Sequence, residues 1–227
     1  MTMGDWKELR SNVATASRIL YREGLVEGFG HISARVPGAD TFIIPRRMSP
    51  ALVTEADLLL MNVQGDVLEG KGMPNSESHI HSSIYKKRPD VGSVAHTHAP
   101  MATVLSNFGK PLRYLNNHAC VFAEGVPIFN EVGHIDSVRL GDEMAAVMGT
   151  CCGLLLRAHG TVTAGKTVEE TAIYALYLEE ACRLQYQSLL IGEDFTSISA
   201  EEAKVIKPKV LNPTTINRGW EYYLSRL

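Results

Sequence analysis

Two glycine-containing turns, each between short apolar runs, constrain the fold of this chain more than any other feature of its sequence. The turn PGAD at 37–40 separates FGHISARV from DTFIIP, and VQGD at 63–66 reverses the run DLLLMNVQGDVLEG. Turn-forming residues between two β-rich segments are typical of a hairpin, whose strands are antiparallel. The sequence therefore predicts a central sheet that is mainly antiparallel.

Segments with helical spacing of apolar residues alternate irregularly with these predicted strands. We expect helices at 5–24, 76–88, 100–108, 136–148 (with Asp136 as its N-cap) and 167–191, and further strands at 92–98, 126–130 and 153–165. No linker or internal repeat interrupts this pattern. The prediction is a single α/β domain over residues 1–227, with helices flanking the sheet and residues 208–227 forming a C-terminal tail.

The composition argues against several classes of protein. Of the 227 residues, 45% are hydrophobic and 21% charged, which is typical of a globular protein with a sizeable core. A formal net charge of -3 without a basic stripe argues against a nucleic-acid partner. No apolar run is long enough for a membrane span, and MTMGDWKELR lacks a signal-peptide core. The four cysteines lack zinc-ribbon spacing, so we expect reduced thiols and a cytoplasmic protein.

The motif HTH at 96–98 points to a metal ion. On a strand, His96 and His98 project from the same face about 6 to 7 Å apart, close enough to share one divalent cation. His159 ends another apolar run and precedes Gly160, which favours a sharp turn. Spacing alone does not join His159 to the pair. An isolated histidine on a strand is more often an ordinary surface or core residue.

Glu77 lies at the predicted start of the helix at 76–88, where the helix dipole and free backbone N–H groups stabilise an anion. Electrostatic complementarity alone would explain a glutamate there, and so would a place above the metal. His81 is one helical turn further on and faces the same way. Either a hydrogen bond to Glu77 or simple burial would account for it.

The motifs EGFGHISAR, PNSESHIHSSIYKKRPDVGSVAHTHAP and LRAHGTVTAGKTVEET, in this order, resemble the class II aldolase/adducin superfamily over nearly the whole chain. The resemblance implies a single α/β domain, a homotetramer or higher homo-oligomer with active sites between subunits, and one divalent metal ion per subunit. It assigns His96, His98 and His159 as metal ligands and Glu77 as the catalytic acid/base. Zinc is the expected metal, with manganese, cobalt or iron as alternatives. The resemblance also allows Trp220, Tyr222 and Tyr223 to close over a site or to dock on a neighbouring subunit.

Several residues depart from the pattern of the sugar-phosphate aldolases in this superfamily. His31, Arg46 and Arg47 replace small polar groups that surround a phosphate there, and arginine presents a planar fork suited to a carboxylate. We expect the small-molecule substrate to contact His31, Arg46, Asn75 and Ser76. A solvated loop would also explain the two arginines, more readily for Arg47 than for Arg46. The expected aldolase tyrosine is missing from LNNHACVF, which offers Asn116, Asn117 or His118 instead. Of these, His118 is the candidate catalytic residue.

These departures favour the decarboxylase branch of the superfamily. The predicted function is metal-dependent decarboxylation of a small hydroxylated aromatic or ring-cleavage carboxylate through a metal-stabilised enolate. The alternatives are a class II aldolase acting on a hydroxy acid, sugar or sugar phosphate, and a non-catalytic adducin-like scaffold. Oxygen chemistry at iron is a further minor alternative.

Overall fold

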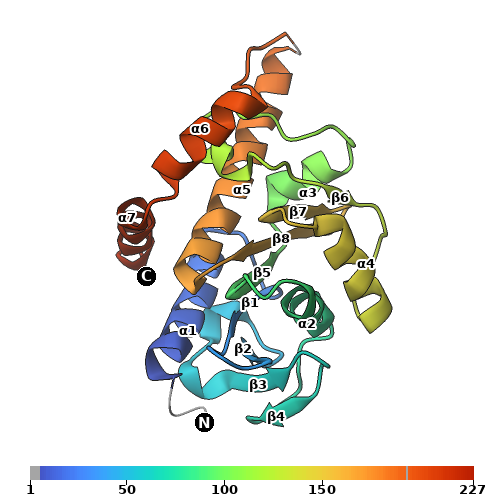
Figure 1. Cartoon of the computed structure of the whole chain (residues 1–227), viewed down its shortest axis with the longest axis vertical. Coiled ribbons are helices and arrows are strands. Elements are labelled where there is room, and N and C mark those ends of the chain that lie inside the picture. The colour runs from blue at the N-terminus through green and yellow to red at the C-terminus, as the bar shows by residue number, and fades with distance from the viewer. Residues whose placement is uncertain (1–5, 193) are drawn as a thin grey trace.

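An eight-stranded sheet forms the centre of the computed structural model, which describes residues 6–192 and 194–227 (Figure 1). The strand order is β4-β3-β2-β1-β5-β8-β7-β6, and neighbouring strands are antiparallel except for the parallel pair β6 and β7. The bounds are β1 (His31–Arg35), β2 (Thr41–Pro45), β3 (Leu58–Asn62), β4 (Val67–Glu69), β5 (Ser93–Thr97), β6 (Ile128–Phe129), β7 (Gly153–Leu156) and β8 (Gly160–Gly165). The predicted mainly antiparallel sheet is confirmed.

Helices cover both faces of this sheet (Figure 1). Within the described residues they are α1 (Lys7–Arg22), α2 (Ser78–Lys87), α3 (Pro100–Ser106), α4 (Val138–Met148), α5 (Val168–Ile191), α6 (Ala200–Val210) and α7 (Pro213–Leu224). The larger core cluster lies between the sheet and α1 and α5, and the smaller one between the sheet and α2 and α4. The predicted single α/β domain with flanking helices is therefore confirmed.

The local chemistry of the chain explains why these elements begin and reverse where they do. Gly38 and Gly65 occupy the two predicted turns with φ of +73° and +101°, a region that favours glycine. Thr167 caps α5 by accepting a hydrogen bond from the backbone N–H of Glu170. For α4 the predicted cap was wrong. Ser137, not Asp136, accepts the capping bond because its side chain faces the N–H of Leu140.

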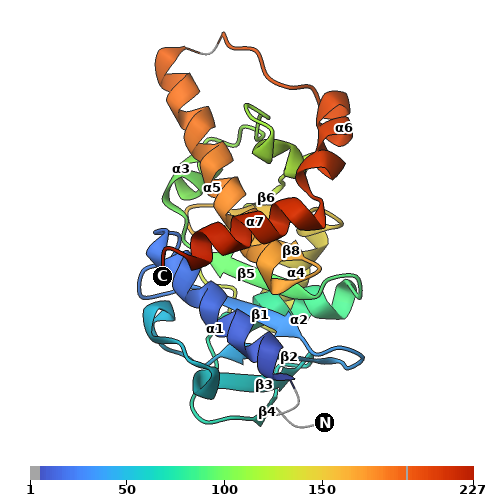
Figure 2. The same cartoon turned by 90° about the vertical axis from the view of Figure 1, so that its left-hand side faces the viewer.

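The C-terminal tail docks on its own chain. Figure 2 shows α7 lying across α5, and it also contacts α1. Trp220 and Tyr223 pack against the larger core, and burial raises the pKa of Tyr223 to about 12. Tyr222 is 54% exposed. Residues 208–227 are thus anchored by their aromatic side chains to the helical layer that supports the sheet.

No helix among the described residues combines the length and the apolar character that crossing a bilayer requires.

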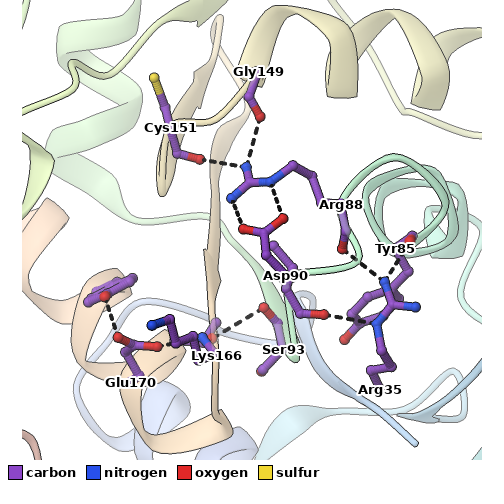
Figure 3. Close-up of polar contacts among 12 residues, drawn as sticks. Arg35, Tyr85, Arg88, Asp90, Ser93, Gly149, Cys151, Lys166 and Glu170 are labelled. Carbon is purple, nitrogen blue, oxygen red and sulfur yellow. Dashed lines mark hydrogen bonds and ion pairs between the residues drawn. The ribbon is translucent and has the colours of Figure 1, made fainter. Parts of the chain in front are cut away.

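One half-buried arginine, Arg88, connects the end of α2 with the end of α4 on the face of the sheet that these two helices cover. Arg88, just after α2, is paired with Asp90 through Nε at 2.9 Å and Nη2 at 2.7 Å (Figure 3). Its Nη1 donates to the carbonyl oxygens of Gly149 at 2.8 Å and Cys151 at 3.4 Å. One guanidinium therefore fixes the end of α4 to the end of α2.

We expect Arg88→Gln to lower the free energy of unfolding by about 1 kcal/mol, because a shorter neutral side chain leaves these acceptors without their donor. Arg139→Gln is the matched control, since Arg139 pairs with Glu143 on the exposed face of α4. An exposed pair of this kind contributes less than about 0.5 kcal/mol. Urea titration of both variants measures the difference, and equal losses would contradict the structural role of Arg88.

Candidate metal centre

The end of β5 brings two imidazole rings together. His96 is fully buried, and its Nδ1 donates to the carbonyl oxygen of Thr161 on the neighbouring strand β8 at 3.0 Å. This bond orients the ring so that Nε2 of His96 faces Nε2 of His98, 3.1 Å away. The predicted convergence of the HTH histidines is present in the structure.

His159 reaches the same place from the turn between β7 and β8. Its ring centroid lies 4.9 Å from that of His96 and 5.1 Å from that of His98. Ala158, immediately before it, has a φ of +58°, and its N–H donates to Ser106 Oγ at 3.0 Å. A β-carbon on Gly160 would lie 2.0 Å from the carbonyl oxygen of Thr97. Only glycine therefore allows β8 to start this close to β5 and to present His159 to the pair.

Glu77 supplies the carboxylate of the cluster from the residue before α2. Its Oε1 accepts a hydrogen bond from the N–H of Ile135 at 2.9 Å, and its Oε2 lies 3.6 Å from Nε2 of both His96 and His159. Burial opposes the charge on Glu77, but its interactions with His159 and His96 and the bond from Ile135 hold its pKa below the ordinary value. Glu77 is therefore an anion facing the histidines.

The donor set fits a divalent cation. Glu77, His96, His98 and His159 each present one ligand atom, and these atoms all lie within 4.8 Å of one another. Burial, His96 and His159 lower the pKa of His98 to about 4, so this imidazole is neutral at physiological pH, as metal binding requires. Three imidazoles with a carboxylate beside them are typical of a catalytic metal site in which one position stays open.

A cavity of about 470 Å³ opens onto this cluster. His31, Asn75 and Ser76, which the sequence predicted as substrate contacts, all line it, together with Glu77 and His98. Asn75 is fixed by a bond from its amide to the carbonyl oxygen of Pro45 at 2.8 Å. Phe29 and Met48 line the cavity with apolar side chains. The cavity therefore combines polar hydrogen-bonding groups with an apolar surface that suits a ring.

Arg46 occupies a different place from the predicted one. It pairs with Asp57 through Nε and Nη2, both at 3.0 Å, and it is not among the residues that line the cavity. Arg47 lines the cavity instead, exposed and with no acidic partner among the described residues. Within this chain, Arg47 rather than Arg46 lines the cavity, because Asp57, eleven residues further on, binds Arg46.

His118 also lies outside the cavity of its own chain. Its Nδ1 is 2.8 Å from Glu180 Oε2, and its ring is stacked on Tyr177 with centroids 4.0 Å apart. The side chain is 42% exposed, so His118 lies at the surface of the subunit. The structure thus separates His118 from Glu77 within one subunit.

His134 is a cavity residue that sequence reasoning missed. Its ring is stacked on His159 at a centroid distance of 5.8 Å. It lies in an irregular loop, where neither strand nor helix periodicity assigns a direction to a side chain. No pattern in the sequence points to it, because its place follows from a tertiary contact in which the N–H of the next residue, Ile135, donates to Glu77.

Comparison with known proteins agrees with this geometry. Residues 11–186 match the family described as "Class II Aldolase and Adducin N-terminal domain", and the chain belongs to that family. A 3,4-dihydroxyphthalate decarboxylase from Terrabacter sp. is 29% identical over 99% of both chains. An L-fuculose phosphate aldolase from Methanococcus maripaludis is 30% identical over 74% of this chain and 91% of its own. The structure of an L-fuculose 1-phosphate aldolase from Glaciozyma antarctica PI12 superposes with a TM-score of 0.85 and 24% identity, covering 99% of this chain and 90% of that one.

We expect His96→Ala to lose most of its bound divalent metal, because it removes the ligand nitrogen at the centre of the cluster. His118→Ala is the control and should keep its metal. Metal content after overnight dialysis, measured by mass spectrometry, and the change in Tm on adding a chelator report the difference. Equal metal content in wild type and His96→Ala would place the ion elsewhere.

Proposed function

We propose that this protein is a divalent-metal-dependent carbon–carbon lyase that decarboxylates a small hydroxylated aromatic or ring-cleavage carboxylate. The observation that carries the proposal is the presence of Arg47 in the same cavity as the Glu77–histidine cluster. A guanidinium without an acidic partner is suited to a substrate carboxylate. Phe29 and Met48 provide the apolar surface that an aromatic ring would contact.

Residues of this chain have separate roles in such a reaction. A cation held by His96, His98 and His159, zinc by preference with manganese, cobalt or iron as alternatives, would supply a Lewis acid for charge developing on substrate oxygen. Arg47, His31, Asn75 and Ser76 hold the substrate's polar groups. When carbon dioxide leaves, its bonding electron pair stays on the substrate carbon. Glu77, an anion in the free site, takes up the proton of the substrate hydroxyl group and delivers it to this carbon, and solvent restores the hydroxyl proton when the product leaves.

The named relatives support two reactions of this kind. The decarboxylase relative matches over its whole length, whereas the aldolase relative leaves about a quarter of this chain unmatched. The second candidate function is therefore retro-aldol cleavage of a hydroxy acid, sugar or sugar phosphate, for which the same cluster would serve. The complete set of Glu77 and three histidines argues against a non-catalytic scaffold.

His118 has a place in this proposal through a neighbouring subunit. We infer an assembly of four or more copies in the cytoplasm, as the resemblance implies, in which His118 of one subunit faces the cavity of the next. The exposed ring, fixed by Glu180 and Tyr177, supports this role, because the side chain is already oriented before a partner arrives. All four cysteines are free thiols.

The reaction is tested by incubating the metal-loaded protein with a panel of hydroxy-aromatic, hydroxy-acid and sugar-phosphate compounds and measuring carbon dioxide and aldehyde release in parallel. We expect carbon dioxide from at least one ortho-hydroxy aromatic carboxylate. Aldehyde release without carbon dioxide would select the aldolase. Release of neither product by a metal-loaded sample would contradict both lyase functions.

Arg47→Gln tests the proposed carboxylate contact. We expect KM for the carboxylated substrate to rise about tenfold or more while metal content stays unchanged, because a charge-assisted hydrogen bond is lost. Arg46→Gln is the matched control. It removes the pair with Asp57 and should lower Tm with a smaller effect on KM. A larger rise in KM for Arg46→Gln than for Arg47→Gln would reverse the assignment.

The role of His118 is tested by mixing subunits. His96→Ala and His118→Ala homo-oligomers should each be nearly inactive, while hybrids reassembled from both should regain part of the activity. Recovery is expected because some interfaces then pair an intact metal site with an intact His118. No recovery in hybrids verified by native mass spectrometry would exclude a role of His118 across the interface.

A further inference from the structure

A line of buried hydrogen-bonding groups leads away from the metal cavity between α2 and β1. His31 Nδ1 lies 2.6 Å from His81 Nε2, and His81 Nδ1 lies 2.6 Å from Ser33 Oγ. Ser33 Oγ lies 2.7 Å from the hydroxyl of Tyr85. All four side chains are at most 6% exposed. The cavity wall at His31 is therefore the outer end of a chain that is closed to solvent.

Two periodicities bring these groups together. His31 and Ser33 are two residues apart on β1 and share one face of the sheet. Glu77, His81 and Tyr85 are spaced by four residues along one side of α2. Where these two rows meet, His81 lies against His31 and Tyr85 against Ser33, while Glu77 lies at the metal cluster. Among the described residues, His81 bonds His31 and Ser33 rather than Glu77, which answers a question that the sequence left open.

The hydroxyl protons give the hydrogen-bond chain a direction. Among the described residues, Ser33 Oγ is the hydrogen-bond partner of the Tyr85 hydroxyl, so the proton of Tyr85 is donated to Ser33. Ser33 then has its own proton to donate, and the acceptors near it are His81 Nδ1 at 2.6 Å and the carbonyl oxygen of Val94 at 3.5 Å. The shorter contact takes the proton, so Ser33 donates to Nδ1 of His81.

This direction fixes the protonation of both imidazoles. A ring nitrogen that accepts a hydrogen bond carries no proton, so an imidazole with one accepting nitrogen is neutral. A neutral imidazole carries one N–H. Because Nδ1 of His81 accepts from Ser33, its proton is on Nε2 and is donated to Nδ1 of His31. The proton of His31 is then on Nε2, the nitrogen left for the cavity.

We propose that Tyr85, Ser33 and His81 are positioning residues that hold His31 as a neutral Nε2–H donor to an oxygen atom of the bound substrate. A neutral donor can bind a carboxylate or phenolate oxygen without placing a second positive charge beside the metal cation. The substrate-binding part of this inference rests on the proposed function. The assignment of the tautomers does not, because it follows from contacts within the protein.

Arg35 holds the Tyr85 end of this hydrogen-bond chain in place. Arg35, next on the same face of β1, donates to the carbonyl oxygens of Tyr85 at 2.5 Å and Arg88 at 3.0 Å, as Figure 3 shows. Its guanidinium also lies 4.7 Å from the centroid of the Tyr85 ring. These contacts tie the end of α2 to β1, so the distance between the two rows is fixed where Tyr85 meets Ser33.

The tautomers are measured directly by long-range ¹H–¹⁵N correlation spectra of the zinc-loaded, [¹⁵N]histidine-labelled protein at pH 7.5. Signals of His31 and His81 are assigned from His31→Gln and His81→Gln samples. We expect both rings to be neutral with the proton on Nε2. A proton on Nδ1 of either ring, or a charged ring, would overturn the proposal whatever reaction the protein catalyses.

Ser33→Ala tests whether the hydrogen-bond chain sets the tautomer of His31. Without the serine donor, both rings should populate a mixture of tautomers, and KM should rise about three- to tenfold with little change in kcat. Ser82→Ala is the matched control, because Ser82 is an equally buried serine on α2 whose hydroxyl bonds the carbonyl of His79. Metal content and circular dichroism verify that each variant is folded.

Failure of the proposed reaction and failure of the proposed effect on His31 give different results. If the proposed reaction is wrong, the tautomers remain as assigned while carbon dioxide release is absent. If the hydrogen-bond chain does not set the tautomer of His31, wild type and Ser33→Ala show the same tautomers and the same KM. A fall in kcat alone would assign His31 to proton transfer rather than to substrate binding, and would also contradict the proposal.

Discussion

The close approach of β8 to β5 is the constraint on which the site depends. The two strands pair in register from Ser93 opposite Gly165 to Thr97 opposite Thr161. At the end of this ladder, Thr161 accepts the Nδ1 proton of His96 and thereby sets which nitrogen faces the cluster. Gly160 lets the backbone continue past Thr97 without a clash. A ladder of ordinary backbone pairing thus brings together ligands that are more than sixty residues apart in the chain.

The sequence predicted the parts of the fold and the site that regular geometry determines. The HTH pair follows from strand alternation, and the glycine turns give antiparallel pairing. Glu77 and His159 were recognisable only with the resemblance to a family, because their distance from His96 in the chain carries no information about their distance in space. The tail was less predictable. Its helices α6 and α7 are stabilised by packing on the rest of the chain, which local sequence does not record.

The residues that line the cavity differ from the expected ones where the backbone is irregular. Arg46 and Arg47 are adjacent, and no periodicity states which of them faces a cavity. A partner remote in sequence, Asp57, decides it by binding Arg46. His134 was missed for the same reason, since its loop is placed by the bond from Ile135 to Glu77. Regular strands and turns therefore position the histidine ligands, whereas tertiary contacts of loops position the residues that face the substrate cavity.

The outermost strands of the sheet have a consequence for how copies of the chain associate. β4 and β6 are three and two residues long, shorter than every strand between them. Edges this short offer few unpaired backbone groups to a passing strand, which protects the sheet against growth by strand addition and against aggregation along its borders. Contacts between copies are therefore expected to form through helices and loops, leaving the hydrogen-bonding ladder that carries the histidines undisturbed.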